Sequence, residues 1–267
     1  MTDLKTNTEG LAANVIVLLD LDNNIFQSER KCPEGDITPV AYKTSGEACG
    51  FMTPQQQTFF NWLSATALVI PNTARDTATF RRALLPFNSY SICSFGGVIL
   101  QPDGNAEQAW HQLIAAEADQ AKEILEEIHT RLLQIASARD FDIRARLVED
   151  QGLTLYISVK HNNHLNHELV DLGQAVQEYL PNDWTVHFND NNLAIFPQFL
   201  GKEKASSWLL ANRINLAKDT VIIGSGDSFT DVAFMAQCHF ALMPAKSQIF
   251  SGVQQLAANP NSDYISD

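Results

Sequence analysis

Two pairs of carboxylates stand out in this chain because each pair follows a short apolar run. Asp20 and Asp22 come directly after the run at 15–19, and Asp227 and Asp231 lie in the segment Gly-Asp-Ser-Phe-Thr-Asp after a run at 221–223. Carboxylates placed at the ends of buried segments are costly unless something compensates their charge. Their residue type and spacing therefore predict that a cation binds among them.

The run at 15–19 consists of β-branched and aliphatic residues, which predicts a strand buried on both faces in a parallel sheet. Open α/β sheets bind their ligands at the carboxyl ends of the strands. Asp20 and Asp22 are therefore expected at the ligand-binding edge of such a sheet.

Composition limits the class of protein. The chain has 267 residues, 31 acidic and 18 basic, with a net charge of −13. This excess of acid argues against nucleic acid or an anionic membrane as the main partner. The four cysteines have no CxxC spacing, and the first residues lack a basic segment followed by an apolar core. We expect a globular cytoplasmic protein with neither a disulfide framework nor a membrane anchor.

Helices and strands alternate at both ends of the chain. Thr53 and Pro54 predict the start of a helix that runs to about 63, and residues 27–51 are expected to form a long loop or flap without regular structure. The other predicted elements are strands at 66–70, 90–93, 221–223 and 239–242, and helices at 76–85, 202–214, 228–236 and from about 247. This alternation is typical of a doubly wound α/β fold with a parallel sheet.

The middle of the chain follows another pattern. Apolar residues recur on one face of a long helix at 110–135, hairpins are predicted at 141–160 and 184–196, and a helix at 165–179 lies between them. We therefore predict an inserted α+β cap domain at 101–197, and a discontinuous core formed by residues 1–100 and 198–267.

Four motifs in this order resemble those of the haloacid dehalogenase superfamily of phosphotransferases. The first, DxDxT, is matched at Asp20 and Asp22, with Asn24 where the family usually has Thr. The second, (S/T)xR, is matched by Thr73-Ala-Arg75. Lys202 matches the lysine that opens a helix, with Lys204 as the weaker candidate, and the GDxxxD motif is complete. The resemblance implies a Rossmann-like catalytic core.

The resemblance also implies a role for each matched residue. Asp20 would be the nucleophile that forms an aspartyl-phosphate, and Asp22 the general acid and base. Mg²⁺ would bind Asp20, the backbone carbonyl of Asp22 and Asp227, with support from Asp231. The expected catalytic residues are Asp20, Asp22, Thr73 and Lys202; the expected substrate-binding residues are Asn23, Thr73, Arg75 and Lys202; and the expected metal-binding residues are Asp20, Asp22, Asp227 and Asp231.

An α/β insert between the second and third motifs resembles the cap of the sugar-phosphatase branch, which includes sucrose-phosphate, trehalose-phosphate and mannosyl-phosphoglycerate phosphatases. This resemblance implies a Mg²⁺-dependent phosphomonoesterase that acts on a small phosphorylated metabolite, with sugar phosphates as the first candidates. Two alternatives remain: a phosphosugar mutase with the same core, and a phosphate-binding or regulatory protein in which Asn24 has removed turnover.

Overall fold

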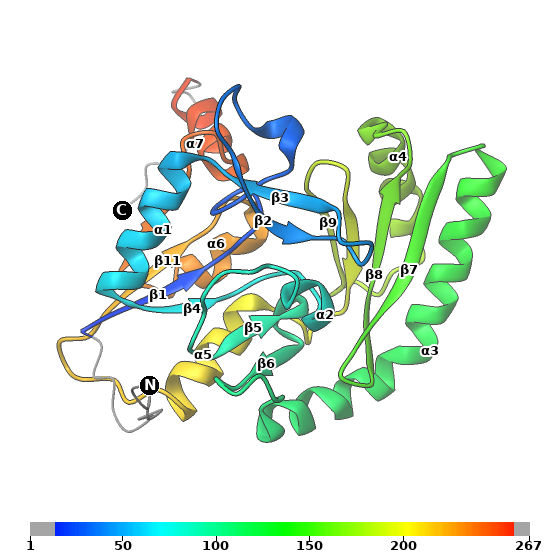
Figure 1. The fold of residues 1–267 in the computed structure, drawn as a ribbon. Helices are drawn as coiled ribbons and strands as arrows, with labels where there is room; N and C mark the ends of the chain where they lie inside the picture. The colour runs from blue at the N-terminus through cyan, green and yellow to red at the C-terminus, as the bar shows by residue number, and fades with distance from the viewer. Residues whose placement is uncertain (1–13, 259–267) are drawn as a thin grey trace. The chain divides into compact units, whose positions relative to one another are not determined.

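A computed structural model of the chain describes residues 14–258 (Figure 1). The chain forms two compact units. The core unit comprises Met1–Thr73, Arg82–Ser91 and Lys202–Asp267, and the insert unit comprises Ala74–Arg81 and Ile92–Gly201. The insert unit thus contains all of the predicted cap at 101–197, together with short segments before it, at 74–81 and 92–100, and after it, at 198–201. The acidic tail after Asn259 and the amino-terminal residues 1–13 lie outside the described residues.

The core unit is built on a parallel sheet, as predicted. Its strand order is β12-β11-β1-β4, and all neighbouring pairs are parallel. These strands are β1 (Val15–Leu19), β4 (Leu68–Pro71), β11 (Val221–Ser225) and β12 (Phe240–Leu242). Because the chain goes from β1 to β4 on one side and later returns to β11 on the other, the strand order reverses at β1. Ligands of open α/β sheets bind at such a switch point.

Four helices accompany this sheet: α1 (Pro54–Thr66), α5 (Lys202–Asn212), α6 (Phe229–Met235) and α7 (Gln248–Ala258). Helix α1 begins as predicted, because Thr53 and Gln56 form a capping box. Helix α6 packs against both α5 and β11. None of the helices within residues 14–258 is long and apolar enough to cross a membrane.

The prediction of a structureless segment at 27–51 is wrong. This segment contains a short 3-10 helix, η1 (Glu29–Lys31), followed by an antiparallel hairpin of β2 (Thr38–Tyr42) and β3 (Ala48–Met52). The hairpin is irregular, with register shifts in its pairing, so it shows no regular alternation of apolar and polar residues. Its turn includes Gly46 at φ +84°, a conformation that glycine adopts without strain.

The predicted helix at 76–85 is also too long, because α2 covers only Thr77–Phe80. Beyond the helix, Ala83 instead forms an antiparallel bridge with Ala41 of β2. The third predicted strand, β5 (Ser91–Cys93), pairs with β6 (Val98–Leu100) in a separate two-stranded sheet and does not extend the parallel sheet. Pairing of Ala83 with the distant Ala41 accompanies the shorter helix, whereas β5 pairs with the nearby β6 in place of the parallel sheet.

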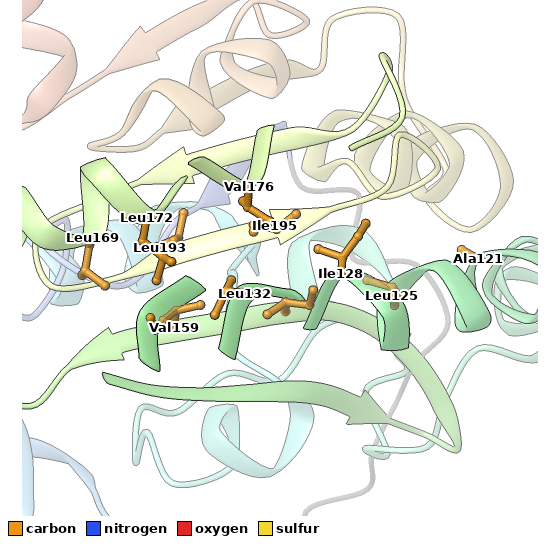
Figure 2. Close-up of a cluster of buried hydrophobic side chains, with 12 residues drawn as sticks. Ala121, Leu125, Ile128, Leu132, Val159, Leu169, Leu172, Val176, Leu193 and Ile195 are labelled. Carbon is orange, nitrogen blue, oxygen red and sulfur yellow. The ribbon is translucent and has the colours of Figure 1, made fainter. Parts of the chain in front are cut away.

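The predicted cap region of the insert unit, after α2 and β6, is an antiparallel sheet of order β7-β8-β10-β9 with two helices. Its elements are α3 (Gln108–Ala138), β7 (Ile143–Asp150), β8 (Leu153–His161), α4 (Asn166–Gln177), β9 (Thr185–Phe188) and β10 (Leu193–Phe196). The predicted helix, hairpin, helix, hairpin order is confirmed. Side chains from both helices meet the sheet in one buried cluster, which includes Leu125, Leu132, Val159 and Leu172 (Figure 2).

Candidate active site

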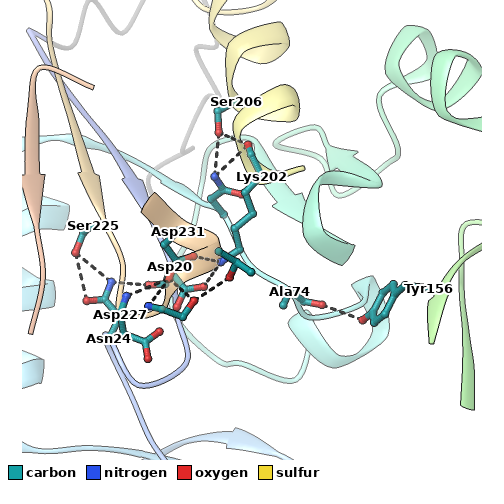
Figure 3. A network of polar contacts seen from close by, with 12 residues as sticks. Asp20, Asn24, Ala74, Tyr156, Lys202, Ser206, Ser225, Asp227 and Asp231 are labelled. Carbon is teal, nitrogen blue, oxygen red and sulfur yellow. Dashed lines mark hydrogen bonds and ion pairs between the residues drawn. The ribbon is translucent and has the colours of Figure 1, made fainter. Parts of the chain in front are cut away.

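The centre of the site is a buried lysine between two buried carboxylates (Figure 3). The Lys202 ammonium, at the start of α5, donates to Asp20 Oδ1 and to Asp231 Oδ1, with a distance of 2.6 Å in both cases. Asp20 follows β1, and Asp231 lies on α6, so three separate elements meet here. All three residues are at most 4% exposed. The structure thus brings these three predicted site residues together within the core unit.

Asp231 also holds the loop that carries Asp227. Its second oxygen, Oδ2, accepts from the backbone N–H of Asp227 at 3.1 Å, and from the backbone N–H and the hydroxyl of Ser228, both at 2.9 Å. A Cβ at Gly226 would lie 2.4 Å from the Asp231 Cβ, so a side chain does not fit there. Glycine and the second aspartate of the GDxxxD motif therefore build one tight turn that places Asp227.

Asp20, Asp227 and Asp231 can each offer a carboxylate oxygen such that the three oxygens lie within 4.8 Å of one another. Three buried carboxylates with the ammonium of Lys202 carry an excess of negative charge, and oxygen ligands of this type suit Mg²⁺. Since both oxygens of Asp231 already accept hydrogen bonds, Asp20 and Asp227 are the better candidates for direct metal ligands. The donor set thus fits a divalent cation.

The charges in this cluster shift its titration. Burial raises the pKa of Asp20 well above its usual range; Lys202 opposes this shift, whereas Asp231 and Asp227 add to it. Burial alone would lower the pKa of the Lys202 ammonium, but the attraction of Asp20 and Asp231 outweighs it and raises that pKa above its usual value. Lys202 is therefore protonated at neutral pH, and positive charge beside Asp20, from Lys202 and from a bound cation, favours its carboxylate form.

Mg²⁺ is expected to stabilise the protein more at about pH 8 than at about pH 5. Asp20 has a higher pKa in the folded protein than in the unfolded chain, so its carboxyl group takes up a proton on folding. The metal-free protein therefore loses stability as pH rises from the unfolded pKa to the folded pKa of this group. A bound cation removes this loss, whereas at acidic pH it must compete with the proton. Thermal unfolding with Mg²⁺ and with EDTA at both pH values tests this; an equal or larger gain at the acidic pH would contradict it.

Asn24, at the position of the Thr in the DxDxT motif, connects the ends of β1 and β11 through hydrogen bonds. Its side-chain nitrogen donates to the Asp20 carbonyl at 2.9 Å and to Ser225 Oγ at 3.1 Å (Figure 3). Asn24 is buried, and Ser225 is the last residue of β11. The amide therefore provides a hydrogen-bond donor beside Asp20, so the departure from the family motif does not leave this position without one.

Asn24→Ala is expected to lower the free energy of unfolding by about 1–3 kcal/mol, because it leaves buried groups of Asp20 and Ser225 without a partner. Urea unfolding measures the change as a lower midpoint with an unchanged slope. Asn61→Ala, at an exposed position of α1, is the matched control and should change stability by no more than about 0.5 kcal/mol. Equal midpoints for the two variants would show that the hydrogen bonds of Asn24 do not stabilise the protein.

Other predicted residues of the core unit lie on the loops beside this cluster. Thr73 is fully buried just after β4. Asp22 is partly buried beyond β1, and its carboxylate is not part of the acidic cluster found within residues 14–258. Asn23 has φ 58°, and its side-chain oxygen accepts from the Lys31 ammonium at 2.7 Å. Contact of Asp22, Asn23 and Thr73 with a substrate stays a prediction.

Arg75 belongs to the insert unit, where its guanidinium donates to the Thr79 carbonyl at 3.4 Å. Its expected role in substrate binding also stays a prediction. The structure adds residues to which the motifs do not point: Ser225, Asn72 and Ser206. A signal for Ser206 exists in its position one helical turn after Lys202, and for Asn72 in its position directly before Thr73.

No protein-family model and no curated protein sequence matches the chain. Among solved structures, it is similar to the C-terminal domain of trehalose-6-phosphate phosphatase from C. albicans, with a TM-score of 0.57 and 11% identity over 94% of this chain and 78% of that one. It is also similar to an IMP-bound mutant of IMP-nucleotidase from Plasmodium falciparum, with a TM-score of 0.56 and 9% identity over 92% and 68%. It is similar, too, to a protein from Thermoplasma acidophilum, with a TM-score of 0.55 and 13% identity over 95% of this chain and 91% of that one.

At such low identities, the likeness establishes the fold and leaves the activity to be argued from the site. The match covers nearly the whole chain, including both the parallel sheet and the insert. The chain therefore shares the fold of these proteins, with a parallel core sheet and an α+β insert.

Proposed function

We propose that this protein is a Mg²⁺-dependent phosphomonoesterase that works through an aspartyl-phosphate at Asp20. The observation that carries the proposal is the contact of Asp20 with Lys202 at the carboxyl end of β1. A carboxylate oxygen of Asp20 also lies within 4.8 Å of an oxygen of Asp227 and of Asp231. Phosphoryl transfer needs a positioned nucleophile and positive charge near the phosphoryl oxygens. This site supplies the nucleophile and one fixed positive charge.

Stabilisation of the phosphoryl group during its transfer depends on Lys202 and Thr73. In the proposed complex, the Lys202 ammonium keeps Asp20 in the carboxylate form and attracts a phosphoryl oxygen, and the Thr73 hydroxyl donates a hydrogen bond to another. When bound to Asp20, Asp227 and the Asp22 carbonyl, Mg²⁺ supplies further positive charge and lowers the pKa of Asp20.

The proposed reaction has two steps. In the first, an Asp20 oxygen attacks phosphorus, the bond from phosphorus to the ester oxygen breaks, and protonated Asp22 gives its proton to the leaving oxygen. In the second, Asp22 takes a proton from water, the water oxygen attacks phosphorus, and the bond between Asp20 and phosphorus breaks to release inorganic phosphate. Asp22 is then protonated again, so the cycle closes.

The proposed substrate is a small phosphorylated metabolite, with sugar phosphates first. Support comes from the α+β insert between the Thr73 and Lys202 motifs, and from the structural similarity to a trehalose-6-phosphate phosphatase domain. Similarity to an IMP-nucleotidase makes nucleotides the second class to test. The site offers no argument for nucleic-acid or membrane partners.

Release of inorganic phosphate from sugar phosphates, nucleoside monophosphates and p-nitrophenyl phosphate, with Mg²⁺ and with EDTA, tests this proposal. We expect release that needs Mg²⁺ and that differs among the sugar phosphates. Transfer of phosphate between two positions of one sugar, without net release, would instead indicate a mutase. Mg²⁺ binding without turnover of any ester would overturn the phosphatase and favour a binding or regulatory protein.

A further inference from the structure

Asn72, the residue after β4, connects two parts of the core unit that carry predicted catalytic residues. Its backbone N–H donates to the carbonyl of Leu19, which precedes Asp20, at 2.8 Å. Its side-chain nitrogen donates to Ser206 Oγ at 2.9 Å and to the Lys202 carbonyl at 3.4 Å. Asn72 is 0% exposed. A single buried side chain therefore connects the strand ends to the first turn of α5.

The chemistry of these groups fixes their donor and acceptor roles. The Lys202 carbonyl can only accept, so the nitrogen of the Asn72 amide faces it. Ser206 Oγ gives its own hydrogen to the same carbonyl at 2.6 Å (Figure 3). It accepts a hydrogen bond from the Asn72 amide. The result is a chain of hydrogen bonds from the Asn72 amide through the Ser206 hydroxyl to the Lys202 backbone, and such chains strengthen each member.

This arrangement does not maximise stability. The Asn72 side-chain oxygen is buried and has no hydrogen-bond partner within residues 14–258. An unsatisfied buried acceptor destabilises a folded protein, and an apolar residue would avoid that cost. The presence of Asn72 at this buried position is better explained by its side-chain nitrogen, which donates to the turn that carries Lys202.

We propose that Asn72 and Ser206 are positioning residues for Lys202: they fix the first turn of α5 so that the ammonium lies between Asp20 and Asp231. The inference rests on the proposed function, in which Lys202 contacts the phosphoryl group. A displacement of about 1 Å in a catalytic group lowers turnover by about a hundredfold. Loss of either residue should therefore lower kcat while leaving substrate binding nearly unchanged.

Kinetics of Ser206→Ala and Asn72→Ser with p-nitrophenyl phosphate and Mg²⁺ provide the first test. We expect kcat to fall at least about tenfold and KM to stay within about twofold. Ser207→Ala is the matched control, because Ser207 is exposed on the same turn and its hydroxyl donates to Gln237 at 2.7 Å. If Asn72→Ser does not fold, Ser206→Ala decides. Wild-type kcat in folded Ser206→Ala would overturn the proposal.

A second readout needs no turnover. In protein labelled with ¹⁵N-lysine, the buried Lys202 ammonium should give its own slowly exchanging signal, identified by its loss in Lys202→Met. We expect this signal to shift or broaden in Ser206→Ala and to match the wild type in Ser207→Ala. An unchanged signal in Ser206→Ala would overturn the inference. A shifted signal in Ser206→Ala, alongside a wild-type protein that hydrolyses no ester, would uphold the positioning role and refute the phosphatase.

Discussion

Asp20→Asn is expected to lower phosphate release by about four orders of magnitude or more, because it removes the proposed nucleophile. The protein should stay folded. The substituted amide would carry no charge in a cluster where burial, Asp231 and Asp227 already disfavour the carboxylate, and Lys202 would keep its contact with Asp231. Without metal at neutral pH, thermal unfolding of the variant should occur at or above the wild-type temperature. Phosphate release and thermal unfolding measure the two effects.

Asp219→Asn is the matched control for this result. Asp219 is exposed in the segment before β11, so the same change of side chain should leave both activity and unfolding temperature near those of the wild type. Near wild-type turnover in Asp20→Asn would exclude Asp20 as the nucleophile. A variant that is inactive because it is unfolded would contradict the electrostatic account of the cluster.

Lys202→Met is expected to remove activity and also to destabilise the protein by about 3–5 kcal/mol near neutral pH, because it leaves buried carboxylates without their cation. The loss should be smaller at about pH 5, where the carboxyl groups take up protons more readily. Mg²⁺ should also recover part of the stability. Urea unfolding at two pH values, with and without Mg²⁺, measures these effects.

Lys204→Met provides the comparison on the same helix, since Lys204 is exposed two residues further along α5. It should change stability by no more than about 0.5 kcal/mol and leave turnover intact. This pair also decides between the two lysines that the sequence offers for the third motif. A larger loss of activity in Lys204→Met than in Lys202→Met would reverse that assignment.

The parallel core and the insert are predictable from sequence because continuous apolar runs and apolar residues at helical spacing indicate their strands and helices. The run at 15–19 is continuous, as a strand covered on both faces must be, and the apolar stripe of α3 repeats at helical spacing over its whole length. The hairpin of β2 and β3 and the separate pairing of β5 with β6 are not predictable in this way. Their strands have only three to five residues each, so each strand carries too little apolar pattern to indicate its partner.

The same distinction holds for the site. Asp20, Lys202 and Asp231 were identifiable because their motifs fall at strand ends and helix starts, where a parallel sheet brings residues together. Asn24, Asn72 and Ser206 lie beside these motifs, but their residue types do not indicate a role, since Asn and Ser are common in turns and on helices. Their importance arises from hydrogen bonds across up to 201 positions of sequence, which only the folded chain shows.

The most direct test of the account is to trap the covalent intermediate. Asp22→Asn removes the base for the second step, whereas p-nitrophenyl phosphate carries a leaving group that departs without acid assistance. After this variant reacts with p-nitrophenyl phosphate and Mg²⁺ and is quenched with acid, we expect peptide mass spectrometry to find one phosphoryl group on Asp20. Asp20→Asn should carry none. Hydrolysis that proceeds with Asp20 unmodified, or a phosphoryl group on another residue, would contradict the proposed mechanism.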